Sequence, residues 1–323
     1  MPRIAGTVTT DLTSPWGLAF LPDGSALVAE RDTGEIKRVV RGGSTTTVGT
    51  VRGVEPGGEG GLLGLAVAPT YASDQLVYAY YTSDEDNRIV RMRLEGSRLG
   101  PQRVVLDGIP SAGVHNGGRL LFGPDGHLYA GTGEASDQPL AQDRDSLGGK
   151  ILRITPAGAP APGNPFPGSP VWSYGHRNVQ GLAFDSGGRL WASEFGQDTW
   201  DEINLIRKGG NYGWPEVEGI AREDGFVDPL AQWRTSEASP SGLAYADGAL
   251  WMASLRGERL WRIQLNGTRL AGKPRAFFTD DLGRLRTVAR APGGDLWLST
   301  SNTDGRGDPR DGDDRILRLQ LSR

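Results

Sequence analysis

A pattern of short apolar segments and glycine-containing turns recurs six times along the 323 residues of this chain. Each copy has an apolar segment, a turn with Asp or Gly, a second apolar segment with an aromatic residue, and then an alternating segment such as RILRLQL at 315–321. Apolar runs of this length between such turns predict short antiparallel strands. The copies span residues 14–39, 60–94, 115–154, 178–206, 239–265 and 284–321.

The spacing of the copies, roughly 45–65 residues, is typical of the blades of a β-propeller. One sheet of three or four strands cannot bury both of its faces, whereas six sheets stacked around an axis can. No segment shows a helical periodicity that competes with this interpretation. The sequence therefore predicts an all-β fold, a six-bladed β-propeller that forms one domain over residues 1–323. We expect residues 4–12 to add a strand to the blade made by the C-terminal copy.

Composition and charge exclude several classes of function. Cysteine is absent, which excludes disulfides, thiolate metal ligands and cysteine catalysis. The net charge of −4 does not favour nucleic acid as a partner. No stretch approaches the roughly 20 apolar residues of a membrane span. Residues 1–3 lead directly into a strand-like segment without a visible signal peptide, so the sequence favours either a cytoplasmic protein or a mature segment with an added start Met.

Histidine is rare in this chain, and one of the three residues has a position suited to catalysis. The inner strands of a propeller converge on a central channel, where loops from several blades meet. His115 precedes the third copy in the sequence GVHNGG, where flanking glycines leave it open to a ligand. Because imidazole titrates near neutral pH, His115 is a candidate general base. We expect His176 to be a hydrogen-bonded loop anchor and His127 to be a solvated turn residue.

Arginine dominates the basic residues, since only four of the 35 are lysines. Four arginines lie at the edges of predicted blades: Arg177, Arg256, Arg284 and Arg286. Each one alone is most simply a solvated surface residue, but together at one channel mouth they would bind a ligand with several carboxylates. The nearby segment SEFGQD at 193–198 has few paired carboxylates, so a metal ion there would depend on backbone carbonyls, as calcium often does.

Seven motifs, taken in order, resemble those of the soluble quinoprotein aldose sugar dehydrogenases, and the likeness covers essentially the whole chain. They are GEGGLLGLA (58–66), VHNGGRL (114–120), GHRNVQGLAFD (175–185), SEFGQDTWDEINLI (193–206), KGGNYGWP (208–215), SLRGERL (254–260) and TSNTDGRGDPRDGDDRIL (300–317). The resemblance implies a six-bladed propeller that uses pyrroloquinoline quinone (PQQ) and Ca²⁺. It also implies oxidation of aldose sugars at the anomeric carbon to lactones, an external electron acceptor, and a periplasmic or secreted location.

The same resemblance assigns roles to the residues nearest the reaction. His115 matches the catalytic base, which takes the proton of the anomeric hydroxyl while hydride passes to C5 of the quinone. Arg177 and Asn178 match residues that hydrogen-bond the quinone oxygens, with Arg177 near the reacting carbonyl. The main-chain carbonyls of Gly196 and Gln197 match the calcium ligands, although the family has Pro where this chain has Gln197.

Further matches concern the cofactor carboxylates and the sugar. Arg284 and Arg286 match the pair that clamps the PQQ carboxylates. Arg256 falls where sugar enzymes of the family can carry Lys, and Glu59 falls where glucose enzymes have Gln. Glu59 is therefore expected to accept a hydrogen bond from a sugar hydroxyl, and Trp233 to flank the substrate.

Two other functions stay open on the sequence alone. A six-bladed, metal-dependent lactonase would use carboxylates at strand ends, where Glu30, Glu134 and Glu194 lie. A propeller that serves only as a binding module would not need His115 and the arginines to converge. A nicotinamide cofactor is not indicated, since no GxGxxG motif follows a strand and opens a helix.

Overall fold

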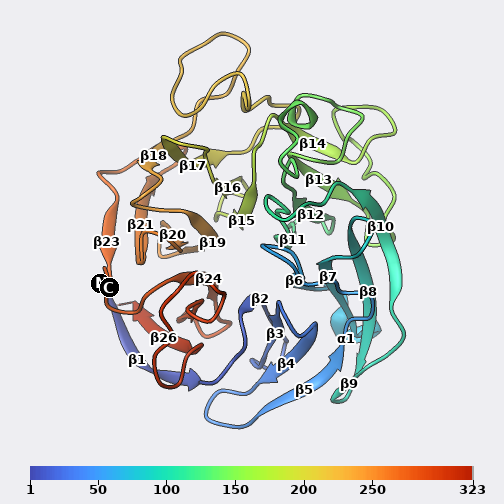
Figure 1. Ribbon diagram of the computed structural model, residues 1–323, viewed down its shortest axis with the longest axis vertical. Helices are drawn as coiled ribbons and strands as arrows, with labels where there is room; N and C mark the ends of the chain where they lie inside the picture. The colour runs from blue at the N-terminus through green and yellow to red at the C-terminus, as the bar shows by residue number, and fades with distance from the viewer. Residues whose placement is uncertain (322–323) are drawn as a thin grey trace.

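Six antiparallel sheets of four or five strands surround a central axis in the computed structural model, which describes residues 1–321 (Figure 1). Each sheet corresponds to one copy of the sequence repeat, and neighbouring strands within each sheet run in opposite directions. The predicted all-β, six-bladed β-propeller is therefore confirmed. The strands nearest the axis are the first of each blade, as Figure 1 shows for β2, β6, β15, β19 and β24.

The first three blades contain strands β2 to β14. Blade 1 consists of β2 (Pro15–Phe20), β3 (Ala26–Glu30), β4 (Glu35–Val39) and β5 (Thr45–Thr50). Blade 2 consists of β6 (Leu62–Val67), β7 (Leu76–Thr82), β8 (Asn87–Glu95), β9 (Arg98–Leu99) and β10 (Arg103–Ile109). Blade 3 consists of β11 (Leu120–Phe122), β12 (Leu128–Gly131), β13 (Lys150–Ile154) and β14 (Val171–Tyr174).

The last three blades contain strands β15 to β26. Blade 4 consists of β15 (Val179–Phe184), β16 (Leu190–Glu194), β17 (Trp200–Leu205) and β18 (Ala231–Arg234). Blade 5 consists of β19 (Pro240–Ala246), β20 (Ala249–Ser254), β21 (Arg259–Asn266), β22 (Arg269–Leu270) and β23 (Arg275–Phe277). Blade 6 consists of β24 (Leu285–Arg290), β25 (Leu296–Thr300), β26 (Ile316–Leu321) and the N-terminal β1 (Pro2–Thr9).

The ring closes where the two ends of the chain share a sheet. Strand β1 pairs antiparallel with β26, with Pro2 opposite Leu321 and Thr9 opposite Ile316. Both strands lie side by side at the outer edge of blade 6 (Figure 1). The expected closing strand is therefore confirmed, over Pro2–Thr9 rather than residues 4–12.

Helices contribute little to this fold. The two that occur are each four residues long, α1 (Tyr71–Asp74) and the 3₁₀ helix η1 (Gln138–Ala141). Over residues 1–321, no helix has the length and apolar character needed to cross a membrane.

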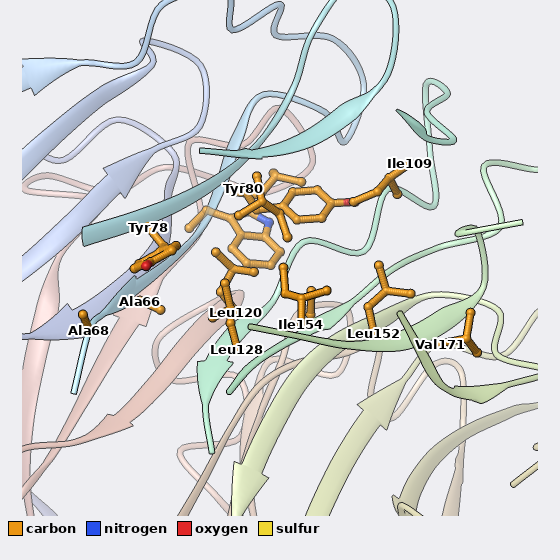
Figure 2. Close-up of a cluster of buried hydrophobic side chains, with 14 residues drawn as sticks. Ala66, Ala68, Tyr78, Tyr80, Ile109, Leu120, Leu128, Leu152, Ile154 and Val171 are labelled. Carbon is orange, nitrogen blue, oxygen red and sulfur yellow. The ribbon is translucent and has the colours of Figure 1, made fainter. Parts of the chain in front are cut away.

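Neighbouring blades are packed together by apolar side chains that include large aromatic rings. Figure 2 shows such a cluster between blades 2 and 3, where Tyr78 and Tyr80 of β7 meet Leu128 and Ile154. All four side chains are fully buried. Blades 4, 5 and 6 each place a buried tryptophan on their second strand, namely Trp191, Trp251 and Trp297. Burial of apolar surface between the sheets is the main stabilising contribution to the ring.

The inner strands of adjacent blades approach each other so closely that one position of the repeat is glycine in four blades. The glycines are Gly17, Gly64, Gly181 and Gly242, each followed by Leu-Ala. A Cβ atom on Gly64 would lie 2.0 Å from the carbonyl oxygen of Gly118, which belongs to the next blade. On Gly181 it would lie 2.3 Å from the carbonyl oxygen of Ser241. These contacts are backbone to backbone, so a side chain here cannot be accommodated by a rotamer change.

We predict that Gly64→Ala lowers the free energy of unfolding by about 1–3 kcal/mol, because two inner strands must move apart to admit the methyl group. The free energy is measured by urea denaturation. Gly293→Ala is the matched control, since a Cβ there meets no atom within 4 Å. Equal stability of the two variants would contradict the close-approach explanation.

Candidate functional site

A cavity of about 310 Å³ opens at one end of the propeller axis, where the inner strands begin. All blades except the third contribute side chains to its wall. The wall contains six arginines and three carboxylates, so its formal charge is positive in a protein of net charge −4. These charged residues are Arg31, Arg177, Arg256, Arg284, Arg286 and Arg306, with Glu59, Asp201 and Asp304. Such a cavity favours an anionic ligand.

Arg284 and Arg286 lie together in this wall because they alternate along β24 and the loop before it. Both guanidinium groups donate to Oδ2 of Asp304, at 3.1 and 3.2 Å. Nη1 of Arg286 also donates to Gln180 at 3.0 Å, while its Nε is buried without a partner. Burial lowers the pKa of Arg286 to about 10. The guanidinium of Arg286 and then that of Arg284 hold the pKa of Asp304 below its usual value despite burial.

Arg177 lines the cavity from the start of blade 4, whereas the next residue, Asn178, is buried outside the cavity wall. The guanidinium of Arg177 lies 5.4 Å from the ring of Trp214, and its Nε is buried without a hydrogen-bond partner. Burial lowers the pKa of Arg177. Asn178 is 1% exposed and does not line the cavity; its Oδ1 accepts a hydrogen bond from the backbone of Gly117 at 2.9 Å. Asn178 therefore connects blade 4 to the segment that carries His115.

His115 and Glu134 form a hydrogen-bonded pair behind Glu59 of the cavity wall, and neither residue of the pair lines the cavity itself. Nδ1 of His115 lies 2.8 Å from Oε2 of Glu134, whose side chain is only 1% exposed. The main-chain N–H of His115 donates to Glu59, which lines the cavity, at 3.1 Å. Because a carboxylate accepts hydrogen bonds, this contact assigns the proton to Nδ1 and leaves Nε2 as an acceptor. Nε2 makes no hydrogen bond within residues 1–321, and the His115 side chain is 16% exposed.

The loop with Gly196 and Gln197 wraps around the carboxylate of Glu218. Oε1 of Glu218 accepts four backbone N–H groups, those of residues 197–200, at 2.8–3.2 Å. A Cβ on Gly196 would lie 1.8 Å from the carbonyl oxygen of Trp200, so only glycine fits this turn. Among the described residues, nothing donates a hydrogen bond to the carbonyl oxygens of Gly196 and Gln197. Both residues line the cavity, which therefore has uncommitted oxygen donors.

An ion pair crosses the cavity mouth from blade 6. Nη1 of Arg306 donates to Oε1 of Glu59 at 2.8 Å, and the Arg306 side chain is 54% exposed. Glu59 thus holds Arg306 with one oxygen and the backbone of His115 with the other. Arg256 also lines the cavity, and it makes no hydrogen bond or ion pair within the described part of the chain.

The structure does not bring Trp233 to this cavity. Trp233 is 5% exposed and lies in the core of blade 4 and blade 5, with its ring 5.5 Å from that of Trp261. Its strand, β18, is the outer strand of blade 4, far in sheet order from the inner strand β15. The expectation that Trp233 flanks the substrate is therefore wrong, because its side chain packs between blades.

The other strand-end carboxylates have structural partners rather than a shared metal site. Oε2 of Glu194 lies 2.6 Å from Nδ1 of His176, whose ring stacks on Tyr212 at 4.5 Å. Burial lowers the pKa of His176 and raises that of Glu194, so this anchoring pair stays without net charge. Glu30 accepts the backbone N–H of Thr13 at 2.9 Å. In residues 1–321, no three or more His, Asp or Glu side chains form a group that could hold a metal ion, so Glu30, Glu134 and Glu194 do not form a shared carboxylate site.

The roles of several residues of the site were not identified from the sequence. Glu134 lies three residues after β12, 19 residues beyond His115, and a similar spacing of 18 residues separates His176 and Glu194, which is a signal that could have found the pair. Asp304 lies in the acidic loop TSNTDGRGD, and Gln180 follows Asn178 by two residues. Nothing in their local sequence indicates that they contact the same arginine.

We predict that Asp304→Asn lowers the free energy of unfolding at pH 7 by about 3–5 kcal/mol, because two buried guanidinium groups lose their shared counter-ion. The folded pKa of Asp304 is depressed, so its contribution is present above the unfolded pKa of 3.8 and is lost as pH falls through the folded value. The difference between wild type and variant, measured by urea denaturation, should therefore shrink below about pH 3.8. Asp308→Asn, at an exposed carboxylate, is the control; a similar loss there would contradict the interpretation.

Comparison with known proteins agrees with the site. The model of the family described as glucose/sorbosone dehydrogenase matches residues 12–318. The solved PQQ-bound aldose sugar dehydrogenase of Streptomyces coelicolor is 63% identical, with a TM-score of 0.97 over 99% of this chain and 98% of that one.

Two curated relatives are more distant. Aldose sugar dehydrogenase YliI of Escherichia coli is 32% identical over 331 residues, which cover 91% of this chain and 89% of the relative. Quinoprotein glucose dehydrogenase B of Acinetobacter calcoaceticus is 34% identical over 257 residues, which cover 68% of this chain and 54% of the relative. On the match over residues 12–318 and these similarities, the chain belongs to the glucose/sorbosone dehydrogenase family.

Proposed function

We propose that this chain is a PQQ-dependent aldose sugar dehydrogenase that oxidises the anomeric carbon of aldoses to lactones with the help of Ca²⁺. The observation that carries the proposal is the His115–Glu134 pair beside a cavity rich in arginine. Sugar oxidation requires a general base, and the free Nε2 of His115 can serve as one. An anionic quinone cofactor requires positive charge for its binding, which the arginines supply. The names of the relatives support the same activity.

The cavity residues fit PQQ, which is planar and carries three carboxylates. Arg177 and Arg286 each have a buried Nε without a partner, and Arg256 has no bound partner among the described residues. Arg284 and Arg286 share a single carboxylate, so their remaining N–H groups are available to an anion. We assign the cofactor carboxylates to Arg256, Arg284 and Arg286 and the quinone oxygens to Arg177. Asn178 does not line the cavity, so we assign it the role of positioning the segment that carries His115.

The proposed calcium ligands are the carbonyl oxygens of Gly196 and Gln197. Calcium accepts backbone carbonyls, and these two accept no hydrogen bond in the described residues. Glu218 holds the loop by binding its N–H groups. The loop is therefore fixed from the side opposite to its carbonyls, and the substitution of Gln197 for Pro does not remove a main-chain ligand.

When bound, PQQ supplies the two-electron acceptor for the hydride of the sugar, and Ca²⁺ polarises the quinone. His115 accepts the proton of the anomeric hydroxyl on Nε2, since its Nδ1 already donates to Glu134. Glu134 holds the ring in this tautomer and stabilises the imidazolium that forms. Loss of the hydroxyl proton and of the hydrogen on the anomeric carbon, with its electron pair, leaves the C=O of the lactone.

Glu59 is the residue that we assign to the sugar. Its carboxylate lines the cavity mouth and already binds the backbone of His115, so a hydroxyl bonded to Glu59 lies close to the base. A carboxylate accepts hydrogen bonds but cannot donate them. Glu59 is therefore suited to a sugar that presents a hydroxyl donor at this point.

An external electron acceptor must reoxidise the cofactor after each turnover, since no second redox group is implied. A periplasmic or secreted location is supported only by the resemblance to quinoprotein sugar dehydrogenases.

We predict that the chain, freed of metal by a chelator, reduces an artificial electron-accepting dye only when PQQ, Ca²⁺ and an aldose are all added. The rate of dye reduction is measured across a panel of aldoses, and PQQ binding is followed separately by its absorbance. Omission of Ca²⁺ should abolish or strongly reduce the rate. Absence of both a PQQ-dependent absorbance change and dye reduction with every sugar would contradict the proposed function.

We predict that His115→Ala keeps PQQ affinity within about twofold and lowers kcat by about 100- to 10,000-fold, which is the usual range for a general base. Glu134→Gln should lower kcat less and leave KM almost unchanged, with recovery in Glu134→Asp. The measurements are steady-state dye reduction and PQQ titration. His127→Ala is the matched control, because that ring lies in a turn and bonds Arg153. Normal turnover of His115→Ala would remove His115 from its role.

A further inference from the structure

A second, larger cavity of about 670 Å³ opens at the opposite end of the axis, where the inner strands end. Every inner strand contributes its last residues to the wall, and most of these residues are apolar. The repeat places one residue per blade at this rim: Phe20, Val67, Phe122, Phe184, Tyr245 and Arg290. The proposed dehydrogenase function does not use this cavity.

An arginine in this wall occupies the repeat position that is glycine in four blades. Arg119 precedes Leu120 as Gly17 precedes Leu18 and Gly64 precedes Leu65. Blade 6 has Thr287 at the same position. Arg119 lines the second cavity and not the first, although it is only 7% exposed. Blade 3 therefore has a long cationic side chain near the axis at the position where four other blades have glycine.

The contacts of Arg119 hold its guanidinium but do not neutralise it. Nε donates to the carbonyl oxygen of Gln180 at 2.7 Å, and Nη2 donates to Thr287 at 3.1 Å. The guanidinium lies 4.3 Å from the ring of Trp16. Nη1 makes no hydrogen bond in the described chain. Because this atom is not fully buried and Arg119 lines the cavity, Nη1 can donate to a ligand there.

No carboxylate lies in contact with Arg119 in residues 1–321, and the charged group that affects its pKa is another cation, Arg286. Burial and then Arg286 lower the pKa of Arg119 to about 9. The carboxylate in the cavity wall, Asp185, is already bound by Arg189 and Trp191 at 2.7 and 2.8 Å. A buried cation without a counter-ion is costly, and an anion that reaches it gains a charge-assisted hydrogen bond.

We infer that the second cavity binds a monocarboxylate with an apolar body, its carboxylate on Arg119 and its aliphatic or aromatic part against the ends of the inner strands. The carboxylate receives the free Nη1 donors, and the apolar wall removes the ligand body from water. Arg290 at the rim adds a second positive charge on the route of entry.

Octanoate is the probe that tests this site, with 1-octanol as the neutral isostere. Binding to the full chain is measured by titration calorimetry, with the first cavity saturated with PQQ and Ca²⁺ and again without them. We expect octanoate to bind at least about tenfold more tightly than 1-octanol, because a hydrogen bond to a charged group is worth that factor or more. We expect Arg119→Gln to remove this preference and Arg119→Lys to keep part of it.

A second pair of variants covers the case in which Arg119→Gln does not fold. Ala289 is a half-buried residue of the wall, so Ala289→Glu places a negative charge beside the ligand and Ala289→Gln is its neutral match. We expect only Ala289→Glu to weaken octanoate binding. The inference is overturned if octanoate and 1-octanol bind equally, or if neither binds. It is also overturned if octanoate binding is abolished by PQQ or by Arg256→Gln while the Arg119 and Ala289 variants bind normally, since the anion then occupies the first cavity. The outcome does not depend on turnover, so the dehydrogenase proposal and this one fail separately.

Discussion

The backbone-to-backbone contact between adjacent inner strands is the constraint on which the rest of this structure depends. Without a side chain at Gly64 or Gly181, the strands of neighbouring blades lie close enough to form a narrow central channel. A wider ring would separate the loops that carry residues as distant in sequence as Glu59 and Arg306, which are joined at 2.8 Å. The functional cavity is thus a consequence of how tightly the sheets pack around the axis.

In the wall of the first cavity, positive charges outnumber negative ones, so the wall is suited to an anionic ligand. Six arginines face three carboxylates, and Asp304 alone serves both Arg284 and Arg286. Burial depresses the pKa of Arg177 and Arg286, because removing a guanidinium from water disfavours its charged form. A polyanion that binds here opposes this effect and stabilises the fold by mass action. Site formation and protein stability are therefore coupled through the same guanidinium groups.

The sequence was sufficient to predict the fold, because each repeat carries its own strand and turn pattern. The ring closure by the N-terminal strand and the gathering of Arg177, Arg284 and Arg286 followed from the same periodicity. Two aspects could not be predicted. Trp233 was expected to flank the substrate, but its place on an outer strand directs it into the core. Asp304 meets Arg286 across loops whose conformation depends on contacts between blades, and a local pattern does not encode such contacts.

The closure of the ring by β1 and β26 has a consequence for synthesis of the chain on the ribosome. After residue 283 has been added, five sheets have been made, and β1 has no partner because β26 does not yet exist. Arg284, Arg286 and Asp304 are also still missing, so the nascent chain cannot offer the complete arginine cavity. Ligand binding in this cavity must therefore follow translation of the final blade. A chain that stops early is left with an open ring, and its unpaired strand edges are exposed to other chains.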